Sequence, residues 1–207
     1  KPLLPFETAA DKVALSDSRP LYHGMTGLQT AVIRFLGNVI ERKEKDLYLY
    51  SDQNIDWFTA DKVFQAKWMS LMIGCVTSGV KIHIIHKIER NLTEIGEAIR
   101  SWLPLYPSGQ IESFYLDGQK NTNFSTTLFL CPGYACIYGN NVVGTENENG
   151  NYLYVTEPEK INLCRQFFDT LLGKAYRLIR ICKTADFSQF EMFSSDITVL
   201  SSSPTVF

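Results

Sequence analysis

The succession of helix, glycine and strand near residue 80 is the feature that most constrains the fold. Apolar residues at helical spacing predict a helix over residues 57–78. Ser78 and Gly79 end it, and Gly79 suits the left-handed cap of a helix C-terminus. Residues 80–85 follow at once as a β-branched, nearly continuous apolar strand. Such a strand is typical of the centre of a sheet covered on both faces, so the chain is expected to form an α/β domain.

Further elements alternate in the same way along the chain. The apolar spacing predicts helices at 26–40, 92–103 and 158–172, and strands at 47–50, 110–116, 125–130, 134–138 and 152–155. Pro132-Gly133 predicts a β-hairpin between two of these strands. The alternation predicts right-handed crossovers and a mixed β-sheet flanked by helices. Residues 26–184 would form this domain, 1–25 a linker or N-terminal arm, and 185–207 a linker or the start of a truncated following segment.

Length, net charge and cysteine content limit the kinds of partner that this chain is expected to bind. The 207 residues suit one compact domain, and the net charge of -2 argues against bulk attraction to nucleic acid or to an anionic membrane surface. No apolar stretch approaches the roughly 20 residues of a membrane-spanning helix. The five cysteines are odd in number and fit no zinc spacing, so they are expected to be reduced, mostly buried thiols. These observations together predict a cytoplasmic protein.

The stretch from Leu47 to Gly139 resembles one half of the phospholipase D-like fold. Like that family, it has a strand that ends in a polar turn and is followed by a long helix. It also has the family's step from a helix through Gly, Val and a basic residue into a strand, at residues 78–84. Residues 125–130 and 134–139 are similar to that family's catalytic hairpin, in which a His-x-Lys-x-x-x-x-Asp motif precedes an apolar strand ending in Gly. The resemblance implies the same half-fold here.

The family's catalytic residues are replaced in this chain. Ser125 stands where the motif has His, Thr127 where it has Lys, and Pro132 where it has Asp. Phosphodiester cleavage in the family needs an imidazole nucleophile and a cation for the phosphoryl oxygens, which hydroxyls do not provide. The resemblance therefore implies a fold that has lost its chemistry.

The chain also resembles domains that accompany helix-turn-helix modules in uncharacterised bacterial transcriptional regulators. Residues 83–90 and 102–106 carry this likeness. It implies a sensing or oligomerisation role, with a homodimer as the expected assembly. DNA would be contacted only through a missing flanking domain, because these residues contain no convincing helix-turn-helix.

Polar residues gather where the predicted strands end, and α/β sheets place binding crevices at the carboxyl ends of their strands. Ser51 and Asp52 follow the first strand, and Trp57 would form an aromatic wall, although Asp52 could instead cap the next helix. His86, with Lys87 and Arg90, could receive an anion or could lie in a solvated loop. Ser125 and Thr127 share one strand face, which either borders the crevice or faces water. The candidate ligand-binding residues are thus Ser51, Asp52, Trp57, His86, Arg90, Ser125 and Thr127.

No metal or cofactor site is expected. His83 and His86 are three apart on one strand, hence on opposite faces, and no nucleotide-binding or hydrolase motif is present. The sequence predicts a non-catalytic domain that senses a small polar or anionic ligand or mediates assembly. Two alternatives stay open: a phospholipase D-like phosphodiesterase or nuclease that uses His86, and a purely structural protein-interaction domain.

Overall fold

The computed structural model describes residues 17–53, 56–87, 105–116 and 123–178. Within these ranges the strands form one eight-stranded sheet in the order β1-β7-β6-β5-β2-β3-β4-β8. β3 pairs in parallel with β2 and β4, and the other pairs are antiparallel. The strands are β1 (Leu21–His23), β2 (Asp46–Ser51), β3 (Lys81–Lys87), β4 (Ile111–Leu116), β5 (Phe124–Cys131), β6 (Ala135–Val142), β7 (Asn151–Val155) and β8 (Tyr176–Arg177).

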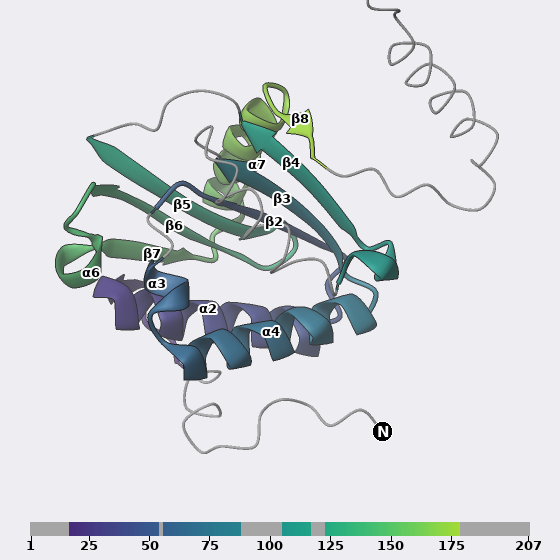
Figure 1. Cartoon of the computed structure of the whole chain (residues 1–207), viewed down its shortest axis with the longest axis horizontal. Coiled ribbons are helices and arrows are strands. Elements are labelled where there is room, and N and C mark those ends of the chain that lie inside the picture. The colour runs from purple at the N-terminus through teal and green to yellow at the C-terminus, as the bar shows by residue number, and fades with distance from the viewer. Residues whose placement is uncertain (1–16, 54–55, 88–104, 117–122, 179–207) are drawn as a thin grey trace, which may run out of the picture.

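Helices cover both faces of the sheet (Figure 1). α2 and α4 lie side by side against one face, and α7 packs against the other, over β5 and β6. The predicted α/β class with a mixed, helix-flanked sheet is confirmed. The helical segments are α2 (Gly24–Glu41), α3 (Asp56–Thr59), α4 (Lys62–Thr77), η1 (Tyr106–Ser108), α6 (Glu146–Asn149) and α7 (Pro158–Leu172).

Alternating side chains on the central strands divide the interior into two cores. Leu47 and Leu49 of β2 point toward α2 and α4, into a cluster that we call the large core. Tyr48 and Tyr50 point the other way, into a smaller cluster that we call the α7 core. Because successive strand residues face opposite sides, one apolar run supplies both layers, as the near-continuous apolar strands predicted.

Several boundaries differ from the sequence-based expectation. Leu21–His23 pairs with β7 and α2 begins at Gly24, so the last residues of the predicted arm belong to the sheet and its first helix. The predicted helix at 57–78 is divided into α3 and α4, because Asp61 caps a new helix by accepting the Val63 and Phe64 amides. Gly79 takes the predicted left-handed conformation, with φ of 84°.

Some sequence-based expectations concern residues that the structure does not describe. The predicted helix at 92–103 and the segment 185–207 lie outside the described residues. Tyr176–Arg177 forms the short strand β8 on the edge of β4. Among the described helices, none combines the length and the apolar character that crossing a bilayer requires.

The predicted hairpin is present and longer than expected. β5 and β6 pair without interruption from Phe124 opposite Val142 to Cys131 opposite Ala135. Gly139 of β6 lies under the Tyr152 ring of β7. A Cβ at this position would come within 2.6 Å of Tyr152 Cδ1 and 2.9 Å of the Asn151 carbonyl oxygen. The glycine thus allows Tyr152 to lie flat against β6.

We expect Gly139→Ala to lower the free energy of unfolding by about 1–3 kcal/mol, because the added methyl group must displace a buried ring and backbone. Urea denaturation measures the change. Gly173→Ala is the control: its Cβ would lie 3.5 Å from its nearest neighbour, and its φ of -62° is helical. That variant should be neutral or slightly stabilised. Equal losses in the two variants would contradict the proposed packing of Tyr152.

Candidate functional site

Three strands, β2, β3 and β5, bring polar residues to one end of the sheet. β5 runs antiparallel to β2, so the start of β5 lies beside the carboxyl ends of β2 and β3. Ser51 is opposite Thr127 on one side and His86 on the other. The three residues lie two positions from core residues of their strands, so they share the face covered by α2 and α4. The structure therefore brings these three predicted residues together, and we call Ser51, His86 and Thr127 the polar row.

A closed ring of hydrogen bonds joins Ser51 and Thr127 of the polar row to Gln53. The Gln53 amide N–H donates to Ser51 Oγ at 3.3 Å, and Thr127 Oγ1 donates to Gln53 Oε1 at 3.1 Å. The two hydroxyl oxygens are 2.9 Å apart. Since the Thr127 proton is already directed to Gln53, Ser51 must donate to Thr127. Tyr152 from β7 donates a further bond to Gln53 Oε1 at 2.8 Å.

Ser125, on the same face of β5, binds a buried carboxylate. Its hydroxyl donates to Glu146 Oε1 at 2.7 Å, and the Gly144 amide donates to Glu146 Oε2 at 2.6 Å. Ser125 is 3% exposed and Glu146 5%. Asn141, opposite Ser125 on β6, accepts the Asn151 amide, whereas its buried Nδ2 has no hydrogen-bond partner among the described residues. Ser125 is thus a structural contact of α6 rather than a group open to solvent.

Asp52 lies on the other side of the sheet. Its Oδ1 accepts the Thr126 amide at 2.5 Å, and its Oδ2 accepts the Tyr50 hydroxyl at 3.1 Å. Burial raises the pKa of Tyr50, and the nearby Asp52 carboxylate raises it further. Asp52 therefore extends the β2–β5 ladder by one side-chain bond. The longer helix α4 is capped by Asp61 instead.

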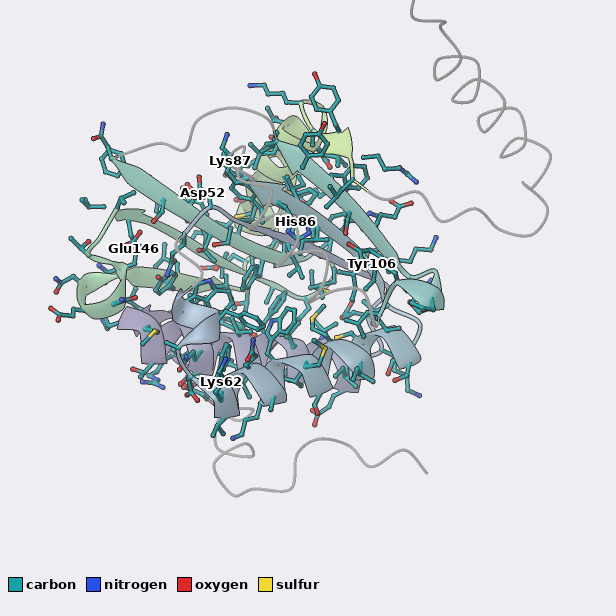
Figure 2. All side chains as sticks on the ribbon, viewed as in Figure 1. Asp52, Lys62, His86, Lys87, Tyr106 and Glu146 are labelled. Carbon is teal, nitrogen blue, oxygen red and sulfur yellow. The ribbon has the colours of Figure 1, made fainter. Side chains whose placement is uncertain are left out.

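His86 is a neutral imidazole at this end of the sheet. Its Nε2 is buried, and desolvation lowers its pKa from 6.5 to about 4. Lys87 follows it and is partly exposed. In Figure 2 the labels of Asp52, His86 and Lys87 gather at this end, whereas Glu146 lies beside α6 and Lys62 on α4. An anion reaching this end would meet Lys87, whereas His86 would carry no charge at neutral pH.

The structure does not place the two remaining predicted residues, Trp57 and Arg90, in the polar row. Trp57 is 8% exposed and packs in the large core, with ring centroids 5.8–5.9 Å from those of Phe58, Phe64 and Phe129. It lies beneath the polar row as part of the apolar interior. Arg90 lies outside the described residues. Gln53, Glu146 and Tyr152 complete the network, and none of them was among the predicted site residues.

The two strand histidines face opposite sides, as expected. His83 stacks on Tyr48 with ring centroids 4.6 Å apart, and its Nδ1 lies 3.1 Å from a Glu112 carboxylate oxygen. Across the described ranges, no group of three or more His, Cys, Asp or Glu side chains is placed to hold a metal ion.

Known proteins resemble this chain in fold and not in sequence. No family model matches it, and no curated protein matches it significantly. TrmBL2, an archaeal chromatin protein whose structure shows a novel mode of DNA binding, is similar with a TM-score of 0.52 and 12% identity. The match covers 78% of this chain and about half, 54%, of TrmBL2. At this identity, the similarity shows a shared fold.

A phospholipase D family member, NUC from Salmonella typhimurium, is more weakly similar. Its TM-score is 0.46 at 12% identity, over 70% of this chain and 90% of NUC. A similarity of this size supports no statement about chemistry.

We expect Ser125→Ala to lower the free energy of unfolding by about 1–3 kcal/mol, because it leaves the buried Glu146 carboxylate without a donor. Thr126→Ala is the control on the same strand, since its hydroxyl makes only a 3.4 Å exposed contact with Asn140. That change should cost less than about 0.5 kcal/mol. Denaturant unfolding at pH 7 measures both, and similar costs would argue against a buried Ser125–Glu146 bond.

We expect His86 to make the fold acid-sensitive. Its folded pKa of about 4 is below the ordinary value of 6.5, so the unfolded chain binds the proton first as pH falls. Stability is therefore full above pH 6.5 and declines toward pH 4, by about 1.4 kcal/mol per pH unit. In His86→Gln this part of the pH dependence should be absent. Unfolding curves of both proteins at several pH values between 4 and 8 test it, and parallel pH profiles would contradict it.

Proposed function

We propose that this chain is a non-catalytic sensing or assembly domain of a larger DNA-binding transcriptional regulator. The single observation that carries the proposal is the closed network at the start of β5. Ser125 and Thr127 occupy the positions that a phospholipase D-like catalytic hairpin gives to its imidazole and its amine, and both hydroxyl protons are directed to buried acceptors.

Cleavage of a phosphodiester at this place lacks the groups it requires. A Ser125 nucleophile would have Glu146 as a base at 2.7 Å, but both side chains are almost fully buried and out of a substrate's reach. Neutral His86 provides no positive charge for the phosphoryl oxygens. The polar groups therefore favour a structural role for the hairpin over hydrolysis.

A ligand would bind at the carboxyl ends of β2 and β3. Ser51, His86 and Lys87 are partly exposed there, offering a hydroxyl, a neutral imidazole and a cation. These groups suit a small polar or anionic compound. Because the Ser51 hydroxyl belongs to the ring through Thr127 and Gln53, a ligand that competes for it would favour one arrangement of β2 and β5 over another.

A specific observation also supports the assembly role. Phe124, Val142 and Leu153, on the α7 side of β5, β6 and β7, are 47%, 52% and 48% exposed. Phe124 and Val142 lie opposite each other on β5 and β6, and an exposed apolar pair favours a contact with another protein surface, such as a homodimer. The fold shared with TrmBL2 supports the DNA-binding context, and DNA itself would be contacted by a domain outside these residues.

The proposal is tested with the 207-residue chain and bis(p-nitrophenyl) phosphate. We expect no hydrolysis above buffer, in the native chain or in His86→Ala. Turnover that disappears in His86→Ala would overturn the proposal in favour of a phosphodiesterase.

A thermal-shift panel of sugars, sugar phosphates, nucleotides and carboxylates separates sensing from assembly. We expect one class to raise Tm, because a ligand that binds only the folded state stabilises it. If that class is anionic, Lys87→Ala should reduce the rise, and Lys62→Ala, an exposed lysine on α4, should not (Figure 2). No rise in any class, with a dimer by light scattering, would leave assembly as the function and overturn sensing.

A further inference from the structure

Arg34 of α2 differs from the other arginines that the structure describes. Each of the others directs its guanidinium to a carboxylate of this chain, in the pairs Arg19–Asp17, Arg42–Glu44, Arg165–Asp169 and Arg177–Glu112. Within the described ranges, Arg34 has no carboxylate partner, although its side chain is partly buried. Partial burial of a cation without a counter-ion costs desolvation free energy, so the chain bears this cost to hold the guanidinium in place.

Two tyrosines and a backbone carbonyl fix the orientation of Arg34. Its guanidinium lies over the Tyr154 ring of β7, with Cζ 3.7 Å from the ring centroid. Nη1 donates to the Tyr22 hydroxyl of β1 at 3.0 Å and to the Arg19 carbonyl oxygen at 2.9 Å. Tyr154 is held in turn, since it is 5% exposed and its hydroxyl oxygen lies 2.8 Å from that of Tyr134. The cation is thus positioned by an aromatic face and two uncharged acceptors.

The edge of the guanidinium that remains open is the one that binds oxyanions. A guanidinium has five N–H groups, and both of those on Nη1 are used in Arg34. Nε and Nη2 have no acceptor in the described part of the chain, and neither is a buried atom lacking a partner, so both reach solvent. Their parallel N–H groups match the two oxygens of a carboxylate. Arg19 shows this use within the chain, because its Nε and Nη2 both donate to Asp17.

We propose that Arg34 is a receptor for a single carboxylate, which binds from solvent to Nε and Nη2. Charge favours a carboxylate over a doubly charged phosphate. The cations nearest to the site, Arg19 and Arg42, lie over the rings of Tyr22 and Tyr134 and are already paired with carboxylates of this chain. The site therefore offers one positive charge, which a singly charged, planar anion neutralises.

The site is separate from the polar row. Tyr134 lies in the turn that follows β5, whereas Ser125 and Thr127 are at the start of that strand, at the other end of the hairpin. A bound carboxylate would neutralise a cation shared by α2, β1 and β7 and so strengthen the contact of the helix with this edge of the sheet. The inference is independent of the proposed function.

Arg165 of α7 provides a matched internal control. It also stacks on a tyrosine, with Cζ 3.9 Å from the Tyr48 ring centroid, and it is also partly buried. Its Nε, however, donates to both carboxylate oxygens of Asp169 at 2.9 Å. Because the stacking is alike and the open edge is not, a different response of the two arginines to a carboxylate can be assigned to that edge.

The test follows the arginine Nε–Hε signals of the isotope-labelled 207-residue chain by proton–nitrogen NMR while sodium acetate replaces sodium chloride at mildly acidic pH and constant ionic strength. Correlation of each side chain with its own backbone assigns both signals in the native chain. We expect the Arg34 signal to move and to saturate, and the Arg165 signal to stay in place. In a monomeric chain, equal movement of both signals, or none at Arg34, would overturn the proposal.

Thermal unfolding gives a second readout. Acetate in place of chloride should raise Tm, because a ligand that binds only the folded state stabilises it. Arg34→Lys keeps the charge but loses the parallel N–H groups, so it should lose most of this rise. Arg165→Lys should keep the rise, which separates binding from the general effect of acetate on unfolding. A larger rise with dimethyl phosphate than with acetate would contradict the preference for a carboxylate. The NMR outcomes concern the native chain and hold whether or not the variants fold.

The source of the carboxylate is either a free small compound or an acidic side chain of a second copy of the chain. A free compound predicts a monomer by light scattering and an acetate response at every protein concentration. A second copy predicts a dimer that Arg34→Lys converts to a monomer, and an Arg34 signal that responds to acetate only after dilution. A dimer that persists in Arg34→Lys, with an Arg34 signal that acetate never moves, would refute both.

Discussion

The convergence of hydrogen bonds on Gln53 fixes the polar end of the sheet, and the rest of the site depends on it. Gln53 follows β2, yet its Oε1 accepts bonds from Thr127 on β5 and from Tyr152 on β7. A buried hydroxyl or amide without a partner is costly, so each of these groups is stable there only while the others remain. The three strands are therefore coupled at the end where α/β sheets bind ligands.

This coupling explains why the start of β5 can hold Ser125 and Thr127 as buried polar residues. Imidazole and ammonium groups at the positions of Ser125 and Thr127 would need water or substrate as partners. Hydroxyls are small enough to be satisfied inside the protein, and here Glu146 and Gln53 satisfy them. Ser51, His86 and Lys87 are partly exposed polar residues at the same end of the sheet.

The sequence was informative where the pattern is local. The helix–Gly–strand step at residues 78–80 and the hairpin turn at Pro132-Gly133 depend on neighbours in the chain, and both are present in the structure. The gathering of Ser51, His86 and Thr127 at one end of the sheet was also predicted, and the strand register places them on one face. The contacts of Gln53, Glu146 and Tyr152 were not predicted, because their partners are between 21 and 99 residues away in the chain.

Trp57 was predicted to line a pocket, but the structure places it in the large core. Its place after a polar turn suggested the wall of a pocket, but the short helix α3 turns the indole inward against Phe129. An aromatic side chain near a strand end is equally suited to a pocket or to a core, and only the path of the chain decides.

The two faces of the sheet therefore differ in how firmly their helices are held. On the α2 and α4 face, a large apolar core and a closed polar ring hold every central strand from the same side. On the opposite face, α7 rests on a smaller cluster, beside exposed Phe124, Val142 and Leu153. A shift of α7 breaks few buried contacts, whereas a shift of α2 would open the large core. A rearrangement of the α7 face should accordingly cost less free energy than a rearrangement of the face covered by α2 and α4.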